Sequence, residues 1–252
     1  MDFWDHLDEL RSCLIKALVA VAVSAVAAFC CKDFLFELVF APSKSDFVTY
    51  RAFAKLVGEA GDFSVALFNP ELAQQFMVHM RVALWTGLLL VSPYVLYLLF
   101  RFVAPGLYAQ ERKYAVCAVG SGYLMFLMGI LVNYFIIFPL TFRFLGTYQV
   151  SADVPNQIAL TSYISMLLML CFLMGLMFEL PVFSWLFAKI GVLKSSFMRR
   201  YRRHAVVAIV IVAAVITPTG DVMTMGVVAL PIYLLYEGSI ALVSATEKSA
   251  AA

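Results

Sequence analysis

Long apolar runs separated by short polar segments dominate this chain. Residues 82–100 and 114–142, for example, contain no charged side chain. Runs of this length cross about 30 Å of hydrocarbon as α-helices. The pattern predicts six transmembrane helices, at about 13–31, 82–100, 114–142, 162–188, 204–217 and 225–243. We therefore expect an all-α integral membrane protein in which residues 1–246 form one polytopic membrane domain and 247–252 a short tail.

The last two predicted spans are short. Residues 205–217 rise only about 20 Å as a helix, which is less than the hydrocarbon thickness of a bilayer. Such a helix thins the bilayer locally, is hidden by neighbouring helices, or extends beyond its apolar run. The pattern alone leaves these possibilities open.

Composition and charge placement agree with a membrane protein. The chain is 63% hydrophobic and 13% charged, whereas soluble domains are about 25% charged. Most of the 18 basic residues fall in segments that six spans place on one side of the membrane, which the positive-inside rule assigns to the cytoplasm together with both termini. These residues are Arg11, Lys16, Arg101, Arg112, Lys113, Lys189, Lys194, Arg199, Arg200, Arg202, Arg203 and Lys248.

Several local signals refine this picture. Asn69-Pro70-Glu71 has the residue order of a helix N-terminus and predicts a helix that continues into the second span. The prolines inside the predicted spans are expected to kink them: Pro93, Pro139, Pro181 and Pro231. The five cysteines lie in or beside apolar runs, where they are expected to be small core residues. Their spacing suggests no disulfide framework and no metal site.

Two acidic positions near the predicted cytoplasmic face attract attention. Residues 3–14 have helical periodicity, with an apolar face and an acidic face that includes Glu9. Glu111 follows Pro105-Gly106 in the charged segment between the second and third spans. Both acids have an ordinary interpretation, as interface residues or helix-end charges. Alternatively, two carboxylates on one face suit two guanidinium groups, because each carboxylate accepts a bidentate pair of hydrogen bonds.

Glu179 is unusual because it lies about 15 Å from the nearest basic flank, near the middle of the bilayer. A charged side chain there costs about 2.5–3.5 kcal/mol on the insertion scale, so it should face protein or a cavity. It either contacts a partner transmembrane helix or forms a hydrogen bond inside the protein, and spacing does not separate these readings. Asp221 lies in a tight turn that ordinary turn chemistry explains.

Short motifs in this order resemble the TatC family, the multispan subunit of the twin-arginine protein translocase. The resemblance runs from about residue 6 to residue 243. Its motifs are H-L-D-E-L-R at 6–11, F-A-P at 40–42, F-V-A-P-G-L-Y-A-Q-E-R-K at 102–113, N-Y-F at 133–135, F-E-L-P at 178–181, T-P-T-G-D at 217–221 and A-L-P-I-Y-L-L-Y-E at 229–237.

The resemblance implies a receptor in the bacterial cytoplasmic (inner) membrane. TatC proteins bind twin-arginine signal peptides of folded cargo and assemble with single-span TatA- or TatB-type subunits, in export powered by the proton-motive force. The matching signal-peptide positions are Glu9, Arg11, Phe102, Pro105, Leu107 and Glu111. Glu179 matches the partner-helix contact, and Pro42 and Asp221 match functionally sensitive external positions.

Two other classes of function fit the sequence less well. A secondary transporter of a small cationic solute would use Glu179 as a midplane site, but the chain shows no internal repeat. An intramembrane enzyme would need a nucleophile–base or metal constellation, and no nucleotide, dinucleotide or zinc-protease motif occurs. We therefore expect no enzymatic activity and no cofactor.

Overall fold

The computed structural model describes residues 3–57, 67–103, 109–149, 151, 156–217 and 220–251. Within these ranges, the side chains of residues 3–6, 53–54, 56–57, 99–103, 109–118 and 249–251 are not described. The described chain is mostly helical, as expected. Its helices along the long axis of the molecule are α1 (Phe3–Cys30), α4 (Gln74–Val103), α5 (Ala109–Val132), α6 (Phe138–Thr147), α7 (Leu160–Phe178), α8 (Leu180–Lys189), α10 (Arg202–Ile216) and α11 (Val222–Ala251).

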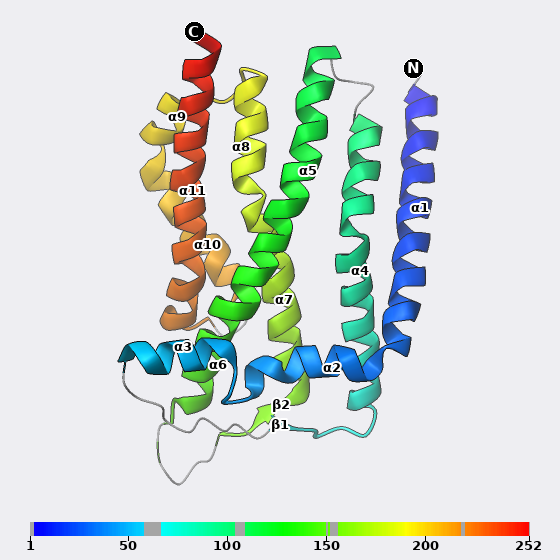
Figure 1. Cartoon of the computed structure of the whole chain (residues 1–252), viewed down its shortest axis with the longest axis vertical. Helices are drawn as coiled ribbons and strands as arrows, with labels where there is room; N and C mark the ends of the chain where they lie inside the picture. The colour runs from blue at the N-terminus through cyan, green and yellow to red at the C-terminus, as the bar shows by residue number, and fades with distance from the viewer. Residues whose placement is uncertain are drawn as a thin grey trace.

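Shorter elements lie mainly at the two ends of this bundle (Figure 1). Helices α2 and α3 run across the end opposite to the two chain termini, close to a small parallel ladder in which Leu67 pairs with Ile158 and Phe68 with Ala159. The short elements are α2 (Lys32–Phe40), the 3-10 turn η1 (Ala41–Ser43), α3 (Val48–Val57), β1 (Leu67–Phe68), β2 (Ile158–Ala159) and α9 (Ser195–Arg200).

Among the described residues, five helical stretches are long and apolar enough to cross a membrane. They are Leu7–Cys30, Gln74–Leu98, Val119–Thr147, Leu160–Lys189 and Val222–Lys248. These five coincide with predicted spans. The remaining predicted span, 204–217, corresponds to α10, whose 15 residues rise only about 22 Å. The segment expected to be a short tail continues α11 as far as Ala251.

The prolines expected to kink the spans take different positions. Pro93 and Pro231 lie inside α4 and α11. The third span contains a π-helical segment, η3 (Asn133–Ile137), and Pro139 lies in the first turn of the helix that follows. Because proline has no N–H, Pro139 cannot bond the carbonyl of Phe135. The hydroxyl of Thr49, on α3, donates to that carbonyl instead.

The fourth span is interrupted where the sequence carries its buried acid. Helix α7 ends at Phe178, Glu179 forms a turn, and α8 continues from Leu180 with Pro181 in its first turn. The Glu179 N–H donates to the Leu176 carbonyl, three residues back, at 3.1 Å. The backbone break and the ionisable side chain therefore coincide.

The core is centred on α7. Tyr163, Ile164, Leu170 and Met174 are at most 1% exposed. Glycine allows α5 to come close: a Cβ on Gly129 would lie only 2.6 Å from the Met174 carbonyl oxygen. Close helix approach through small residues is typical of membrane bundles.

Two sequence expectations were wrong. Helix α4 begins at Gln74 rather than at Asn69-Pro70, because Leu67 and Phe68 pair with β2 and a non-helical segment follows them as far as Ala73. The buried Gln74 amide then donates to the Thr161 hydroxyl on α7. The cysteines also differ: Cys171 is buried, but Cys30 and Cys31 are exposed at the end of α1. Cys117 lies outside the described side chains.

Candidate functional site

Three of the segments predicted to bind a ligand meet at the end of the bundle that carries the termini. The start of α1, the end of α4 and the start of α5 all lie there (Figure 1). Phe102 belongs to the last turn of α4 and Glu111 to the first turn of α5, but their side chains are not described. Pro105 and Leu107 lie outside the described residues. The pairing of Glu9 with Glu111 therefore stays a prediction.

Glu9 is one of the described acids at this end of the bundle. It is partly buried on α1, and its Oε2 atom is inaccessible to solvent and has no hydrogen-bond partner among the described residues. Arg11, two residues later, is exposed, and no ion pair joins it to Glu9 within the described part of the chain. A buried carboxylate oxygen without a donor is costly. This oxygen is therefore suited to accept a hydrogen bond from a bound cation.

Glu179 is a second carboxylate with an unused acceptor. Its side chain is 6% exposed, and Oε1 has no hydrogen-bond partner in the described residues. The carboxylate lies against α5 at Gly122, where an added Cβ would be 2.8 Å from Oε2. The absence of a side chain at Gly122 thus makes room for the carboxylate. Of the two predicted interpretations, the internal hydrogen bond is not found for Oε1 among the described residues. A contact with a partner helix would have to reach the buried Glu179 carboxylate.

At the opposite end of the bundle, α2 and η1 (residues 32–43) form a layer that we call the α2 cap (Figure 1). Pro42 is buried in η1, within this cap. Its carbonyl accepts a bond from the Tyr50 hydroxyl at 2.9 Å, and the same hydroxyl lies 3.1 Å from the Pro139 carbonyl. Burial raises the pKa of the Tyr50 phenol above its usual value, outweighing the opposite effect of Arg143. Tyr50 therefore remains a neutral donor that holds Pro42 against the start of α6.

Two more tyrosines fasten α2 to the bundle. Tyr163 on α7 donates to the Val39 carbonyl at 2.8 Å, and Tyr134 in η3 donates to the Leu38 carbonyl at 2.7 Å. Sequence reasoning missed these contacts. The signal for them was weak: a tyrosine inside an apolar run needs a partner for its hydroxyl, but the run does not say which carbonyl supplies it.

Asp221 has a local structural role in the described chain. Its Oδ1 accepts a bond from the Thr224 N–H at 2.7 Å, which caps the N-terminus of α11. An acidic N-cap of this kind contributes about 1 kcal/mol. The described contact of Asp221 is thus a helix N-cap rather than a turn hydrogen bond, and its predicted functional sensitivity stays a prediction.

Residues 5–231 match the family model of the Sec-independent protein translocase protein (TatC). This chain belongs to the TatC family. It is 33% identical to TatC of Blattabacterium sp. subsp. Periplaneta americana, over 95% of this chain and 94% of that protein. It is 34% identical to TatC of Deinococcus radiodurans, over 95% of this chain and 84% of that protein.

The fold is also that of TatC. A crystal structure of the twin-arginine translocase receptor TatC superposes with a TM-score of 0.76 at 29% identity, covering 96% of this chain and 99% of that one. The chain is therefore a membrane subunit of the Sec-independent translocase and a component of the Tat complex, and not an enzyme. The alternative of a small-solute transporter gives way to this assignment.

Proposed function

We propose that this TatC subunit is the receptor for twin-arginine signal peptides of folded proteins at the cytoplasmic face of the bacterial inner membrane. The observation that carries the proposal is the buried Oε2 of Glu9, which has no hydrogen-bond partner in the described part of the chain. It lies at the end of the bundle where α5 begins with Glu111 in its first turn. The name of the structurally similar receptor adds support.

The chemistry favours arginine over lysine. A guanidinium group offers a planar pair of N–H donors that fits a carboxylate, whereas an ammonium group acts as a point charge. Glu9 and Glu111 would each accept one arginine, with Arg11, Phe102, Pro105 and Leu107 surrounding them. A hydrogen bond to a charged group contributes about 1.5–3 kcal/mol, so losing one carboxylate should weaken binding tenfold or more.

The proposal includes six spans with both termini in the cytoplasm. Its support is that the two termini lie at the same end of the bundle (Figure 1), as an even number of crossings requires. Most of the basic residues also fall in segments assigned to this end. A count of six requires α10 to cross the membrane in addition to the five long stretches. Helix α10 is so short that this crossing requires a thinned bilayer or shielding by neighbouring helices.

Binding of a twin-arginine peptide to purified full-length protein tests the receptor assignment. We expect Glu9→Gln and Glu111→Gln each to raise the Kd about tenfold, and a twin-lysine peptide to bind poorly to the unchanged protein. Asp8→Asn is the matched control, because Asp8 is an exposed acid next to Glu9. Wild-type affinity in both glutamate variants, or an equal loss in the Asp8 variant, would reject Glu9 and Glu111 as the binding carboxylates.

The proposal also assigns Glu179 to assembly with single-span TatA- or TatB-type subunits, in export driven by the proton-motive force. The family resemblance supports the energy source, and the unused Oε1 acceptor supports the contact. A partner helix that presents a hydroxyl or amide donor would satisfy this oxygen. Such a contact requires α5 and α8 to give access to the buried carboxylate.

Paired glycine variants on α5 test this contact without altering the glutamate. Gly122→Ala places a methyl group against the carboxylate, whereas a Cβ at Gly120 meets nothing within 4 Å. We expect Glu179→Ala and Gly122→Ala to reduce co-purification of a TatA-type subunit severalfold, and Gly120→Ala to leave it unchanged. Full retention in both Glu179→Ala and Gly122→Ala, with normal elution of the complex, would contradict the assignment.

A further inference from the structure

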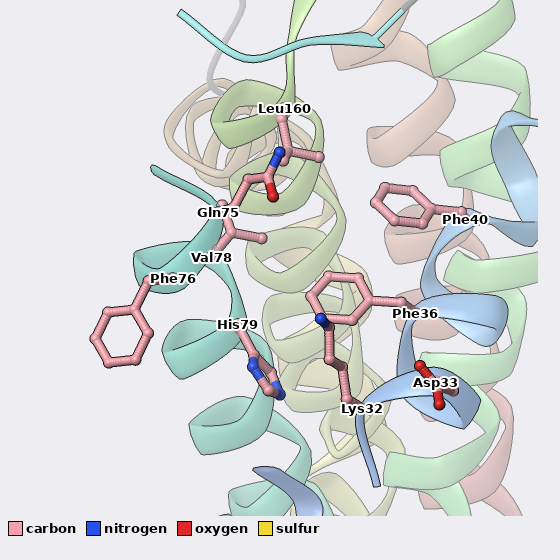
Figure 2. A pocket seen from close by; sticks show the side chains of 9 residues that line it. All are labelled: Lys32, Asp33, Phe36, Phe40, Gln75, Phe76, Val78, His79 and Leu160. Atoms are coloured by element: carbon pink, nitrogen blue, oxygen red, sulfur yellow. The ribbon is translucent and has the colours of Figure 1, made fainter. Parts of the chain in front are cut away.

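A pocket lies between α2 and α4 at the end of the bundle opposite to the termini (Figure 2). Its volume is about 530 Å³, and it combines charged, amide and aromatic side chains. Its lining is Lys32, Asp33, Phe36, Phe40, Gln75, Phe76, Val78, His79 and Leu160. We propose that this pocket binds the headgroup of a zwitterionic phospholipid of the phosphatidylethanolamine type.

The depth of the pocket matches a lipid headgroup. The apolar stretch of α1 ends at Cys30 and that of α4 begins at Gln74, so the pocket lies where two membrane helices leave the hydrocarbon. Lipid headgroups occupy this boundary layer. Helix α2 crosses the same end of the bundle and forms the outer wall of the pocket (Figure 1, Figure 2).

The charged rim offers one partner for each charge of such a headgroup. Figure 2 shows Lys32 extending beside the Phe36 ring towards the space between α2 and α4, with Asp33 farther along the rim. Both side chains are exposed, and neither forms an ion pair with another described residue. The Lys32 ammonium suits the lipid phosphate and the Asp33 carboxylate suits the lipid ammonium group.

The inner wall is rigid. His79 is 9% exposed, its ring stacks on Phe29 with centroids 3.9 Å apart, and its Nε2 donates to the Phe29 carbonyl at 3.1 Å. The edge of His79 also faces Phe36, with centroids 5.5 Å apart. A wall fixed by stacking and a hydrogen bond is pre-organised, which lowers the entropy cost of binding.

A second hollow, an apolar groove, lies along the α1–α4 seam on the side of the pocket nearer the membrane interior. It has a volume of about 250 Å³ and is lined by Ala25, Val26, Phe29, Met80, Ala83 and Leu84. Phe29 lies between the two hollows, because it lines the groove and its ring also contacts His79 and Phe76 of the pocket. The groove stops where the helices meet, since a Cβ on Gly87 would lie 2.6 Å from the Ala25 nitrogen.

A lipid explains both hollows together. The groove opens on a lipid-facing surface, where Val26 is 66% and Met80 51% exposed, and it is lined almost wholly by hydrocarbon. A soluble anion would use the rim but not the groove, while a diacylglycerol would use the groove but not the rim. The opposed charges of Lys32 and Asp33 favour a zwitterionic headgroup over an anionic one.

The test is native mass spectrometry of the delipidated full-length protein in detergent, titrated with defined lipids. The probes are dioleoyl phosphatidylethanolamine, dioleoyl phosphatidylglycerol, dioleoylglycerol, glycerophosphoethanolamine and inorganic phosphate. We expect one saturable site for phosphatidylethanolamine, several-fold weaker binding of the other two lipids, and no binding of the two chain-free compounds over the same range.

Matched variants separate the headgroup from the chain. Lys32→Ala should weaken phosphatidylethanolamine binding about tenfold, and Lys44→Ala, which removes an exposed lysine outside the pocket, should not. Val26→Phe should block the groove, whereas Val23→Phe alters an equally exposed valine outside it. Asp33→Asn should reduce the preference for phosphatidylethanolamine over phosphatidylglycerol. Thermal unfolding of each variant without lipid checks that it is folded.

Defined results would overturn the proposal. Wild-type lipid affinity in both Lys32→Ala and Val26→Phe would show that the lipid does not bind in this pocket and groove. Equally tight binding of inorganic phosphate would make it a simple anion site, and tighter binding of phosphatidylglycerol would reject the zwitterionic headgroup.

Discussion

Helices α1 and α7 have nearly the same apolar character but opposite roles. The apolar stretch of α1 has a mean hydropathy of 2.4, and that of α7–α8 has 2.2. Yet only 6% of the residues in the 18-residue apolar segment of the α1 stretch are buried in the protein, against 50% in that of the α7–α8 stretch. In a membrane, apolar side chains gain little free energy by moving from contact with lipid to the protein interior, because lipid chains are equally apolar. Hydrophobicity therefore identifies a span without saying where it sits in the bundle.

The difference between the two helices lies in their contacts. Helix α1 packs chiefly along α4, with a close approach at Gly87, and leaves most of its surface exposed. Helix α7 contacts α5, α4 and α10 and fastens the α2 cap through Tyr163. We interpret α7 as the scaffold, and α1 as a surface left to lipid and to binding partners.

The largest contrast should come from one substitution made on both helices. Leu170 on α7 is fully buried and Leu18 on α1 is 67% exposed. Leu170→Ala should lower the free energy of unfolding by about 2–4 kcal/mol, because it leaves a cavity. Leu18→Ala should lower it by less than about 0.5 kcal/mol. Thermal or denaturant unfolding in detergent measures both, and equal losses would end the distinction between the helices.

A smaller effect should come from crowding the α5–α7 contact. Gly129→Ala brings a methyl group to 2.6 Å from the Met174 carbonyl oxygen, so it should cost about 1–3 kcal/mol in unfolding free energy. The control Gly120→Ala, on the same helix but facing open space, should be neutral or slightly stabilising. An unaffected Gly129 variant would mean that α5 and α7 separate easily.

The smallest effect on stability should come from removing a hydrogen bond between α7 and the α2 cap. Tyr163→Phe removes the hydroxyl that donates to the Val39 carbonyl and should cost about 1 kcal/mol. Hydrogen exchange should also rise in α2 while remaining unchanged in α1. Tyr97→Phe alters a half-exposed tyrosine on α4 and serves as the control. If exchange in α2 is the same in both variants, the hydroxyl does not hold the cap.

The lengths of the apolar runs were enough to predict the five long membrane stretches and the short helix α10. The break at Glu179 was foreseeable from Pro181, because proline disrupts helical hydrogen bonding. The start of α4 was not, since the parallel pairing of Leu67 with Ile158 joins segments about ninety residues apart. A local N-cap signal at Asn69 carried no information about that contact.

The candidate site was only partly foreseeable from the sequence. The predicted topology assigned Glu9 and Glu111 to the same membrane face, but each could still be an ordinary interface or helix-end charge. Only the family resemblance suggested that they bind a signal peptide. The tyrosine contacts of the cap were missed, because Tyr50 and Tyr134 bond backbone carbonyls, which every residue offers. Nor could the sequence show that Gly122 makes room for the Glu179 carboxylate.

The π-helical segment η3 is equivalent to one inserted residue in an α-helix. It lies between α5 and α6, and beyond it Phe138 and Phe142 meet Tyr163 with ring centroids 5.2 and 5.0 Å apart. Deleting one residue from Asn133–Ile137 would restore a regular helix and keep both rings directed at Tyr163, whereas a regular helix of unchanged length would turn α6 by roughly 100° and move both rings away. A relative with an unbroken helix here should therefore align with a one-residue gap, or else present a different face of α6 to the core.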